Sequence, residues 1–478
     1  MSKENKYNCI IIGAGPAGLA AAWELMKNGQ KSLVLEMDPN LVGGISKTVT
    51  YKDYRFDIGG HRFFTKNEEV LNLWKEVLGE DFLTRNRLSR IYFDNKFYNY
   101  PLKPGNAFSN LGFAMTALIM IDYVKARFFP TKPEKNLEDW VTNRFGKKLY
   151  ETFFKVYTEK VWGIPCSQIN AEWAAQRIKG LSLTSAVKSA IFGSKGDNIK
   201  TLIGQFNYPR LGPGMLYDKM VVKLREFGTE VLMGHGVEKI KWKNDDNPEF
   251  CSLIARNSSG EEVEFFGDAL ISSMPLDLLS QGFDPSPPQQ IVSASKELKY
   301  RDILIVNLII DRETLFPDNW IYIHDPNVLV GRIQNYKNWC SEMVPDQSKT
   351  SLGMEYFCTR GDDIWTSSDR DLIKRASSEI CKLGFIPNPD LVSDGFVVRV
   401  SRTYCVHDTS YQQKIDIIRN FLVKFRNLEV VGRAGMFKYN NQDHSIYTGM
   451  LAARNIALGE NYNIWNVNTD ATYHEEKK

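Results

Sequence analysis

The sequence predicts an α/β protein with a nucleotide-binding sheet domain, a helical insertion and a second domain built on an antiparallel sheet. A glycine-rich turn follows an apolar run near the N-terminus, and helix-period and strand-like patterns follow in separate blocks. We expect the first domain to comprise residues 1–85, 206–285 and 425–478, the helical domain residues 105–205, and the sheet domain residues 86–104 and 286–424.

The apolar run "NCIII" and the turn "GAGPAG" predict a strand, a turn and a helix. Gly13 permits the tight turn, Gly15 lets a pyrophosphate approach the backbone, and Gly18 lets the helix pack close to the strand. A second apolar run, "SLVLE", ends at Glu36, which is placed to bind a ribose hydroxyl. Together these features predict a dinucleotide site.

Two glycine pairs follow in "DPNLVGGISKTVTYKDYRFDIGGHRFFT". Gly43 with Gly44, and Gly59 with Gly60, frame a predicted hairpin and would let the backbone lie against a flat, bulky ligand. A nicotinamide-binding motif is not normally followed by such pairs, so the pattern favours FAD. Two glycine turns in a plain meander are the alternative.

Near the C-terminus, "YNNQDHSIYTGMLAARNIA" places polar side chains directly before a helix. Asp443 or Ser445 could simply cap that helix. The other use is binding, because the first turn of a helix offers free N–H groups and a positive dipole end to a negatively charged ligand. We expect the helix to begin at Ser445 and to point at the cofactor, with Gln442 and Asp443 beside it.

Composition narrows the classes of partner. The formal net charge is only +3, so the protein has no strong positive electrostatic field that would indicate nucleic acid as an obligatory partner. The seven cysteines are scattered, and their spacing matches neither a metal site nor a disulfide framework, so we expect no bound metal. Together with the polar N-terminus, they indicate a cytoplasmic protein. Residues 108–124 are apolar but interrupted by polar residues, so we expect a buried helix and no membrane contact. The sequence is compatible with an oligomer but does not predict one.

These segments resemble the FAD-binding start shared by amine oxidases, protoporphyrinogen oxidases and UDP-galactopyranose mutases. The similarity to the mutases extends over essentially the whole chain through "VYTEKVWGIPCSQINAEWAAQRI", "YPRLGPGMLYDKM", "NWIYIHDPNVLVGR" and "GRAGMFKYNNQDHS". The resemblance implies an FAD-binding Rossmann-like domain assembled from separated segments. It also implies that Val237 contacts adenine and that Arg433 lies in the turn before the last helix.

The resemblance further implies a site for a nucleotide sugar. Arg177 and Arg332 match a pair that clamps the diphosphate, a task suited to the rigid, permanently charged guanidinium. His61 matches a histidine on the loop against the flavin, and we expect these three residues to act in catalysis. The substrate-binding matches are Tyr157 for stacking on uracil, Trp162 near the sugar, Tyr322, Tyr404 and Tyr439 for the phosphates, and Asn441 beside sugar and flavin. Taken singly, each could be an ordinary wall, core or surface residue.

The implied activity is that of a flavin-dependent isomerase that interconverts pyranose and furanose forms of a nucleotide sugar, with N5 of reduced FAD attacking the anomeric carbon. NAD(P)H is a candidate reductant, although no second dinucleotide motif is visible. The segment between Tyr439 and Asn441 is shorter than in eukaryotic mutases. The resemblance therefore does not predict which sugar or which nucleotide base the protein binds. The alternatives are an FAD-dependent oxidase or dehydrogenase of the amine oxidase or protoporphyrinogen oxidase type, and a protein that binds FAD without turnover.

Overall fold

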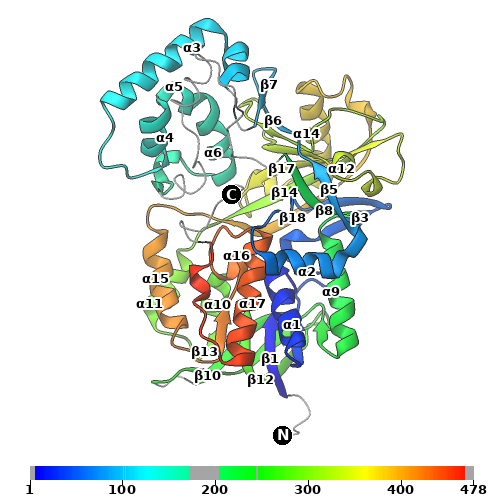
Figure 1. Ribbon diagram of the computed structural model, residues 1–478, viewed down its shortest axis with the longest axis vertical. Helices are drawn as coiled ribbons and strands as arrows, with labels where there is room; N and C mark the ends of the chain where they lie inside the picture. The colour runs from blue at the N-terminus through cyan, green and yellow to red at the C-terminus, as the bar shows by residue number, and fades with distance from the viewer. Residues whose placement is uncertain (1–5, 101, 103, 172–203, 244–245, 469–478) are drawn as a thin grey trace.

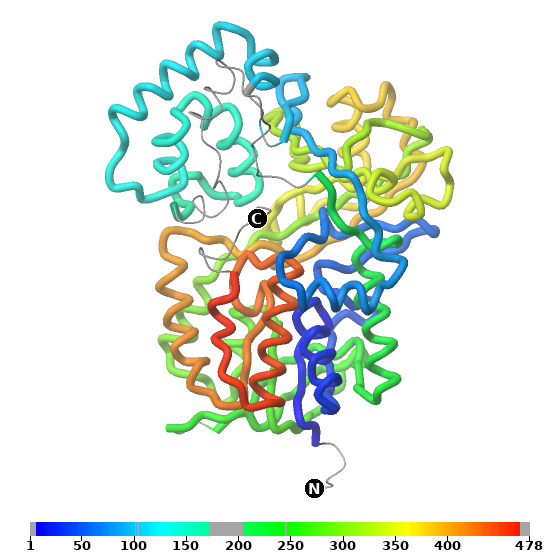
Figure 2. Tube along the Cα trace, in the orientation of Figure 1, coloured from blue at the N-terminus to red at the C-terminus, as the bar shows by residue number. Residues whose placement is uncertain are grey.

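The computed structural model describes residues 6–100, 102, 104–171, 204–243 and 246–468, and it has the predicted α/β fold. A lower body is built on an 8-stranded sheet, and above it lie a 7-stranded sheet and a separate group of helices (Figure 1). In Figure 2, blue, green and red segments lie side by side in the lower body. The lower body is therefore assembled from parts of the chain that are far apart in the sequence.

The 8-stranded sheet has a parallel centre. β1 pairs in parallel with β2 and β12, and β10, β11 and β12 form an antiparallel meander. The central strands are buried on both faces, which explains why they read as continuous apolar runs in the sequence. The strands are β1 (Lys6–Ile12), β2 (Ser32–Leu35), β9 (Glu230–Leu232), β10 (Gly236–Lys243), β11 (Glu249–Arg256), β12 (Glu262–Ser272), β13 (Phe283–Asp284) and β19 (Leu428–Val430).

Helices α1 (Pro16–Lys27) and α17 (Gln442–Leu458) pack against each other at very close range. A Cβ atom at Gly449 would lie 2.0 Å from the carbonyl oxygen of Ala17, so only glycine fits there. The other helices of the lower body are α2 (Glu68–Leu78), α9 (Gly214–Phe227), α10 (Leu276–Gln281), α11 (Gln289–Lys296), α15 (Tyr411–Leu422) and α16 (Gly432–Gly435).

The sequence-based division assigns α11 and α15 to the sheet domain, but both helices pack in the core of the lower body. Ile291 of α11 and Ile418 of α15 are buried in the same apolar cluster as β1. We therefore propose the three-part division with these two helices moved to the first domain.

The 7-stranded sheet runs in the order β18, β14, β17, β16, β15, β6, β7. Its neighbouring strands are antiparallel except β15 and β6, which pair in parallel. Its strands are β6 (Ser89–Phe93), β7 (Lys96–Asn99), β14 (Tyr300–Ile310), β15 (Trp320–Ile323), β16 (Arg332–Asn335), β17 (Thr350–Cys358) and β18 (Val392–Cys405). Helices α12 (Tyr336–Trp339), α13 (Asp363–Thr366) and α14 (Asp369–Lys382) accompany them.

Two short ladders join these parts. β3 (Thr48–Tyr51) and β4 (Tyr54–Asp57) form the hairpin predicted between the glycine pairs. β5 (Phe82–Asn86) pairs with β8 (Gln205–Pro209), so the chain segments on either side of the helical insertion meet.

The described helices of the insertion are α3 (Pro104–Phe128), α4 (Leu137–Phe145), α5 (Lys147–Leu149), a π-helical turn at Tyr150–Lys155 and α6 (Val156–Trp162). The expectation that residues 108–124 form a buried helix is wrong. Phe113 is 91% exposed and Ile121 67% exposed, whereas Ile119 and Tyr123 are buried. α3 covers α4 and α5 from one side only, so its other side faces solvent. By length and composition alone, Gly105–Phe128 could cross a membrane.

Candidate functional site

A large cavity of about 1290 Å³ lies where the three parts of the molecule meet. The lower body contributes the glycine turn after β1, the ends of β2 and β12, and the N-terminus of α17. The 7-stranded sheet contributes β15 and β16, and the helical insertion contributes α6 and the turn before it. Ligands of open α/β sheets bind at the carboxyl ends of the strands, where this cavity begins.

The glycine turn forms a cradle at the floor of the cavity. Gly13 and Gly15 line the cavity, and the α-carbon of Gly44 would lie 3.8 Å from a Cβ atom at Gly15. The N-terminus of α1 has no side-chain cap, so its first N–H groups are available to a pyrophosphate. Gly18 and Gly43 lie behind this surface. A Cβ atom at Gly18 would lie 1.9 Å from the carbonyl oxygen of Gly13, so Gly18 acts through packing.

Gly18→Ala should therefore prevent the glycine turn from closing. The overlap involves backbone, which cannot rotate away, so we expect a loss of about 3 kcal/mol in the free energy of unfolding and the loss of bound FAD. Denaturant unfolding and flavin absorbance of the purified protein measure both effects. Gly105→Ala is the matched control, because a Cβ atom there meets nothing within 4 Å. Normal flavin content in Gly18→Ala would contradict this role.

Glu36 is fixed at the end of β2. Its two carboxylate oxygens accept the backbone N–H groups of Ala14 at 2.7 Å and Asp38 at 2.8 Å. Burial raises the pKa of Glu36 above its ordinary value, although both hydrogen bonds oppose this. Glu36 lines the cavity together with Val237 at the start of β10. This is the arrangement expected for a ribose and adenine at this end.

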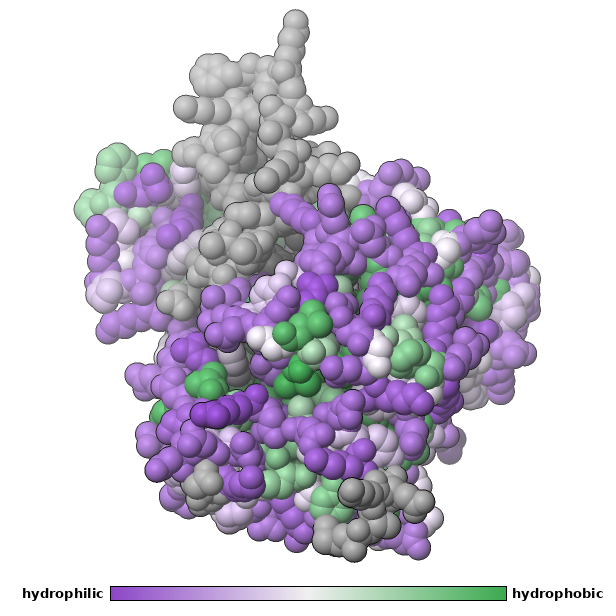
Figure 3. Space-filling view, turned by 60° about the horizontal axis from the view of Figure 1, so that its bottom comes forward, coloured by the Kyte–Doolittle hydropathy of each residue, from purple (hydrophilic) through white to green (hydrophobic). Residues whose placement is uncertain are grey.

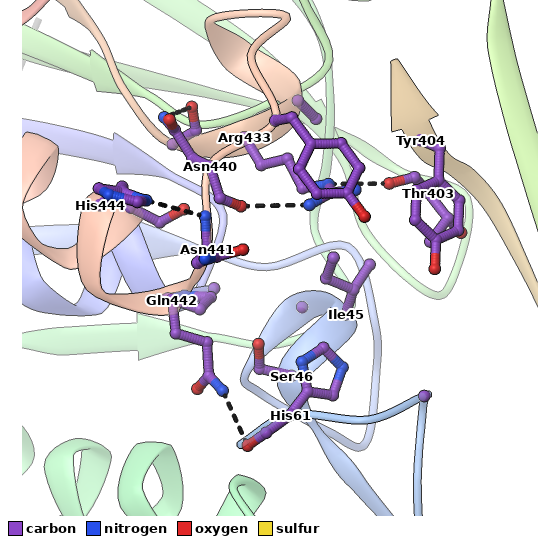
Figure 4. A pocket seen from close by; sticks show the side chains of 18 of the residues that line it. Ile45, Ser46, His61, Thr403, Tyr404, Arg433, Asn440, Asn441, Gln442 and His444 are labelled. Carbon is purple, nitrogen blue, oxygen red and sulfur yellow. Dashed lines mark hydrogen bonds between the residues drawn. The ribbon is translucent and has the colours of Figure 1, made fainter. Parts of the chain in front are cut away.

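Helix α17 begins at Gln442, not at Ser445 as predicted, and Asn441 caps it. The Asn441 side chain accepts a hydrogen bond from the backbone of His444, and the N–H of Asn441 donates to Nδ1 of His444 at 3.2 Å. Gln442 donates from Nε2 to the carbonyl oxygen of His61 at 3.4 Å. Figure 4 shows Asn441 directly above Gln442, whose amide reaches the turn that carries His61.

The polar residues at the start of α17 therefore do both things considered from the sequence: Asn441 and His444 cap the helix, and the helix end opens into the cavity. Gln442, Asp443 and Ser445 all line the cavity. Burial raises the pKa of Asp443 above its ordinary value.

His61 lies on the turn after the second glycine pair and hydrogen-bonds within that turn. Its Nε2 lies 2.6 Å from the carbonyl oxygen of Ile58. Burial lowers the pKa of His61 to about 4, so the ring is neutral at pH 7 and donates to Ile58. Gly60 beside it lies close to β16, where a Cβ atom would be 2.9 Å from Nε2 of Gln334. His61 thus stabilises its own turn while lining the cavity.

Buried histidines should make the protein less stable in acid. Burial lowers the pKa of His324 from 6.5 to about 3, and the side chain is buried against α6. The unfolded chain binds this proton below pH 6.5, so the stabilisation is complete above pH 6.5 and is lost as the pH falls toward 3. We expect His324→Gln to reduce the slope of unfolding free energy against pH by up to about 1.4 kcal/mol per pH unit in this range. Denaturant titrations at several pH values measure this slope for both proteins, and identical slopes would contradict the prediction.

Arg332 projects from β16 into the cavity, and it is held by a carboxylate that the sequence analysis missed. Nε donates to both oxygens of Glu355 at 2.9 Å, and Nη2 donates to one of them at 2.5 Å. Gln334 donates to the same carboxylate at 2.8 Å. Burial lowers the pKa of Arg332, but Glu355 raises it more, so the pKa lies well above its ordinary value.

Strand register explains why these groups meet. Tyr322 lies opposite Arg332 on the neighbouring strand, and Arg332 lies opposite Glu355 on the next. The three side chains therefore form one row across the sheet. Glu355 is completely buried, and it stands as a lone acid in the apolar run "SLGMEYFC". A charge inside an apolar strand was the sequence signal for it.

Aromatic side chains form the wall between the sheet and the insertion. The rings of Tyr157 and His324 stack 4.8 Å apart at 9°, so one face of Tyr157 is already covered. Tyr404 and Tyr439 stack 6.0 Å apart. The predicted substrate residues Tyr157, Trp162, Tyr322, Tyr404, Tyr439 and Asn441 all line the cavity. Arg177 falls outside the described residues.

Arg433 packs on the rings of Tyr404 and Tyr439 in this wall. Its guanidinium carbon is 4.0 Å from the ring centre of Tyr439. It donates to the carbonyl oxygens of Thr403 at 3.0 Å and Asn440 at 3.2 Å. The charge is thus held in place by neutral groups.

The cavity has a basic character. The lining includes Arg62, Lys66, Arg87, Arg332, Arg402 and Arg433 on the basic side, and Glu36 and Asp443 on the acidic side. Glu355 and Asp277 offset part of this charge by pairing with Arg332 and Arg402. The remaining excess suits a ligand with phosphate groups. No metal cluster of His, Cys, Asp or Glu occurs among the described residues.

Comparison with known proteins supports a flavin site. The model of the flavin containing amine oxidoreductase family matches residues 16–437. A crystal structure of reduced UDP-galactopyranose mutase has a TM-score of 0.82 at 20% sequence identity and covers 97% of this chain and 98% of its own. At that identity the likeness concerns the fold.

Two relatives found by sequence have names that indicate different activities. "Probable UDP-galactopyranose mutase" of Klebsiella pneumoniae is 28% identical over 186 residues, which are 35% of this chain and 44% of that protein. The chain therefore matches less than half of that relative's length. 15-cis-phytoene desaturase of Synechococcus elongatus is 26% identical over 406 residues, covering 78% of this chain and 79% of that protein.

The family and the fold imply FAD as cofactor, and the cavity fits it. The uncapped N-terminus of α1 faces the cavity, and Glu36 is fixed at the place expected for a ribose. The N-terminus of α17 and an excess of basic groups complete the surroundings. Because the family match spans most of the sequence, this chain belongs to the flavin containing amine oxidoreductase family.

Proposed function

We propose that this protein is a nucleotide-sugar mutase that interconverts pyranose and furanose ring forms and works with reduced FAD. One observation carries the proposal: Arg332, fixed by Glu355, projects into the same cavity as the glycine cradle. A neutral substrate would not require a pinned guanidinium at that position. The diphosphate of a nucleotide sugar would.

The chain's residues have distinct roles in this proposal. FAD would be held by Gly13, Gly15, Gly44, Glu36 and the N-terminus of α17, and when reduced it supplies a nucleophile for the anomeric carbon. Arg332 and Arg433 stabilise the charge that gathers on the leaving diphosphate, and tyrosine hydroxyls add hydrogen bonds. Because these groups are already held in place, little reorganisation is needed when the charge develops.

Tyr157 offers its free face to the nucleotide base, since His324 covers the other. Asn441 and His61 both line the cavity, and in this proposal they would contact both the substrate and the cofactor. NAD(P)H is the proposed reductant, and polysaccharide biosynthesis is the proposed setting. The seven cysteines are all free, in keeping with a proposed cytoplasmic location.

Ligand binding to the FAD-loaded protein tests the substrate class. Calorimetric titrations with UDP-galactose, UDP, uridine and galactose should show binding of the first two and much weaker binding of the others, because the diphosphate carries the recognition. Equal affinity for uridine and UDP would remove the diphosphate from the proposal.

The second candidate is an FAD-dependent oxidase or dehydrogenase acting on a lipophilic substrate. The apolar part of the cavity lining favours it, which consists of Ile91, Leu102, Leu137, Phe153, Phe154 and Phe357. The exposed apolar side of α3 favours it too. Reduction of the bound flavin by an apolar amine or a polyene, with no binding of nucleotide sugars, would select this candidate.

A further inference from the structure

We propose that the outer face of α3 docks on an anionic lipid surface. We define the α3 face as the exposed side chains of Phe113, Leu118, Ile121, Val124 and Phe128. Their exposed fractions are 91%, 53%, 67%, 47% and 76%, respectively. From the sequence we expected no membrane contact, and docking on lipid replaces that expectation. It does not depend on the reaction proposed above.

The α3 face is one continuous side of a helix. Leu118, Ile121, Val124 and Phe128 recur at the three- and four-residue spacing that places side chains on one side of a helix. Phe113 lies five residues before Leu118, directly after a break in the helix at Gly112. Ile119 and Tyr123 lie on the opposite side and are buried. Gly146 permits this packing, because a Cβ atom there would lie 2.8 Å from the backbone nitrogen of Tyr123. The helix therefore lies along the molecule and presents only its outer side.

Such a face is unusual on a soluble surface. In Figure 3 the visible surface is mainly hydrophilic with scattered apolar spots, and apolar surface gathers at the upper left edge, where the helical part projects. Phe129, 79% exposed, extends the α3 face beyond the end of the helix. A contiguous apolar surface of this kind indicates an interaction site.

Basic side chains surround the C-terminal end of the α3 face. Lys125, Arg127, Lys132 and Lys135 are all exposed. Two of the nearby acids have other partners: Asp122 accepts the backbone N–H of Lys148 at 2.6 Å, and Glu134 pairs with Arg144 at 2.7 Å. An apolar helix face flanked by Lys and Arg is the pattern of a helix that lies in the plane of an anionic membrane.

The same charges argue against a second copy as occupant. A symmetric dimer that packs the C-terminal ends of two α3 faces against each other would bring Lys125 and Arg127 near their own counterparts, and like charges oppose that contact. A lipid surface carrying phosphate groups complements both the apolar face and the basic end. We therefore choose the lipid surface.

Cosedimentation of the FAD-loaded protein with vesicles tests the proposal. We expect binding to vesicles of phosphatidylcholine with phosphatidylglycerol, weaker binding to phosphatidylcholine alone, and a decrease with added salt. Ile121→Ser with Phe128→Ser should weaken binding roughly tenfold or more. Lys125→Glu with Arg127→Glu should remove the preference for anionic vesicles.

Val423→Ser is the matched control, because Val423 is 60% exposed on the lower body. It should leave vesicle binding unchanged. Flavin content and thermal unfolding should stay at the parent's values in every variant. No binding to anionic vesicles at low salt, or equal binding by the Ile121 and Phe128 variant, would overturn the proposal. If the protein forms a dimer that the Ile121 and Phe128 substitutions dissociate, the α3 face binds a second copy of this chain and not lipid. If those substitutions cause a large loss of thermal stability, this chain itself covers the α3 face.

Discussion

Replacing Arg332 with alanine should weaken the binding of UDP-galactose by roughly 30-fold or more and leave FAD bound. The guanidinium is the group that Glu355 aims into the cavity, so its loss removes a charged partner of the diphosphate and leaves a carboxylate behind. Calorimetric titration of the FAD-loaded variant, kept well below its unfolding temperature, measures the change.

Arg90→Ala is the control for that result. Arg90 belongs to the same sheet and makes a bidentate pair with the buried Asp318, at 2.9 and 2.6 Å, but it does not line the cavity. Both variants leave a buried carboxylate without its arginine, so both should be less stable. Only Arg332→Ala should lose ligand affinity. Parent-like affinity in Arg332→Ala would exclude the diphosphate contact.

Glu355→Gln should lower the free energy of unfolding by about 3 kcal/mol, because it leaves the charge of Arg332 partly buried without its counterion. A diphosphate would then supply the missing negative charge. We therefore expect UDP to raise the melting temperature more in Glu355→Gln than in the parent protein. Thermal unfolding with and without UDP measures both effects.

Asp318→Asn is the matched change at the other buried arginine pair. It should also lower the melting temperature, but UDP should raise that temperature only as much as in the parent. An equal response to UDP in all three proteins would mean that Glu355 acts on stability alone and does not prepare Arg332 for an anion.

The lower body was predictable because its signals are local. The turn at Gly13, Gly15 and Gly18 and the acid at Glu36 depend on backbone geometry within one strand, turn and helix. The hairpin between the glycine pairs was predictable for the same reason. The placement of α11 was not, because a short amphipathic helix does not reveal which of two cores it joins.

The site was predictable only in part. The cavity brings together Arg332, Tyr404 and Tyr439 as the family resemblance implied. Glu355 required knowledge of strand register, which places it opposite Arg332. The cap of α17 by Asn441 was missed because several neighbouring polar residues could serve equally well. The exposure of α3 could not be read from hydrophobicity, since apolar residues occur on every side of that helix.

The most direct test of the central claim is a product assay with UDP-galactopyranose. The FAD-loaded protein is reduced with dithionite under anaerobic conditions, and the sugar nucleotides are separated and assigned by nuclear magnetic resonance. The account predicts that the furanose form appears with reduced protein and not with oxidised protein. No change of ring form with this or any other nucleotide sugar, in a protein whose flavin is fully reduced, would contradict it.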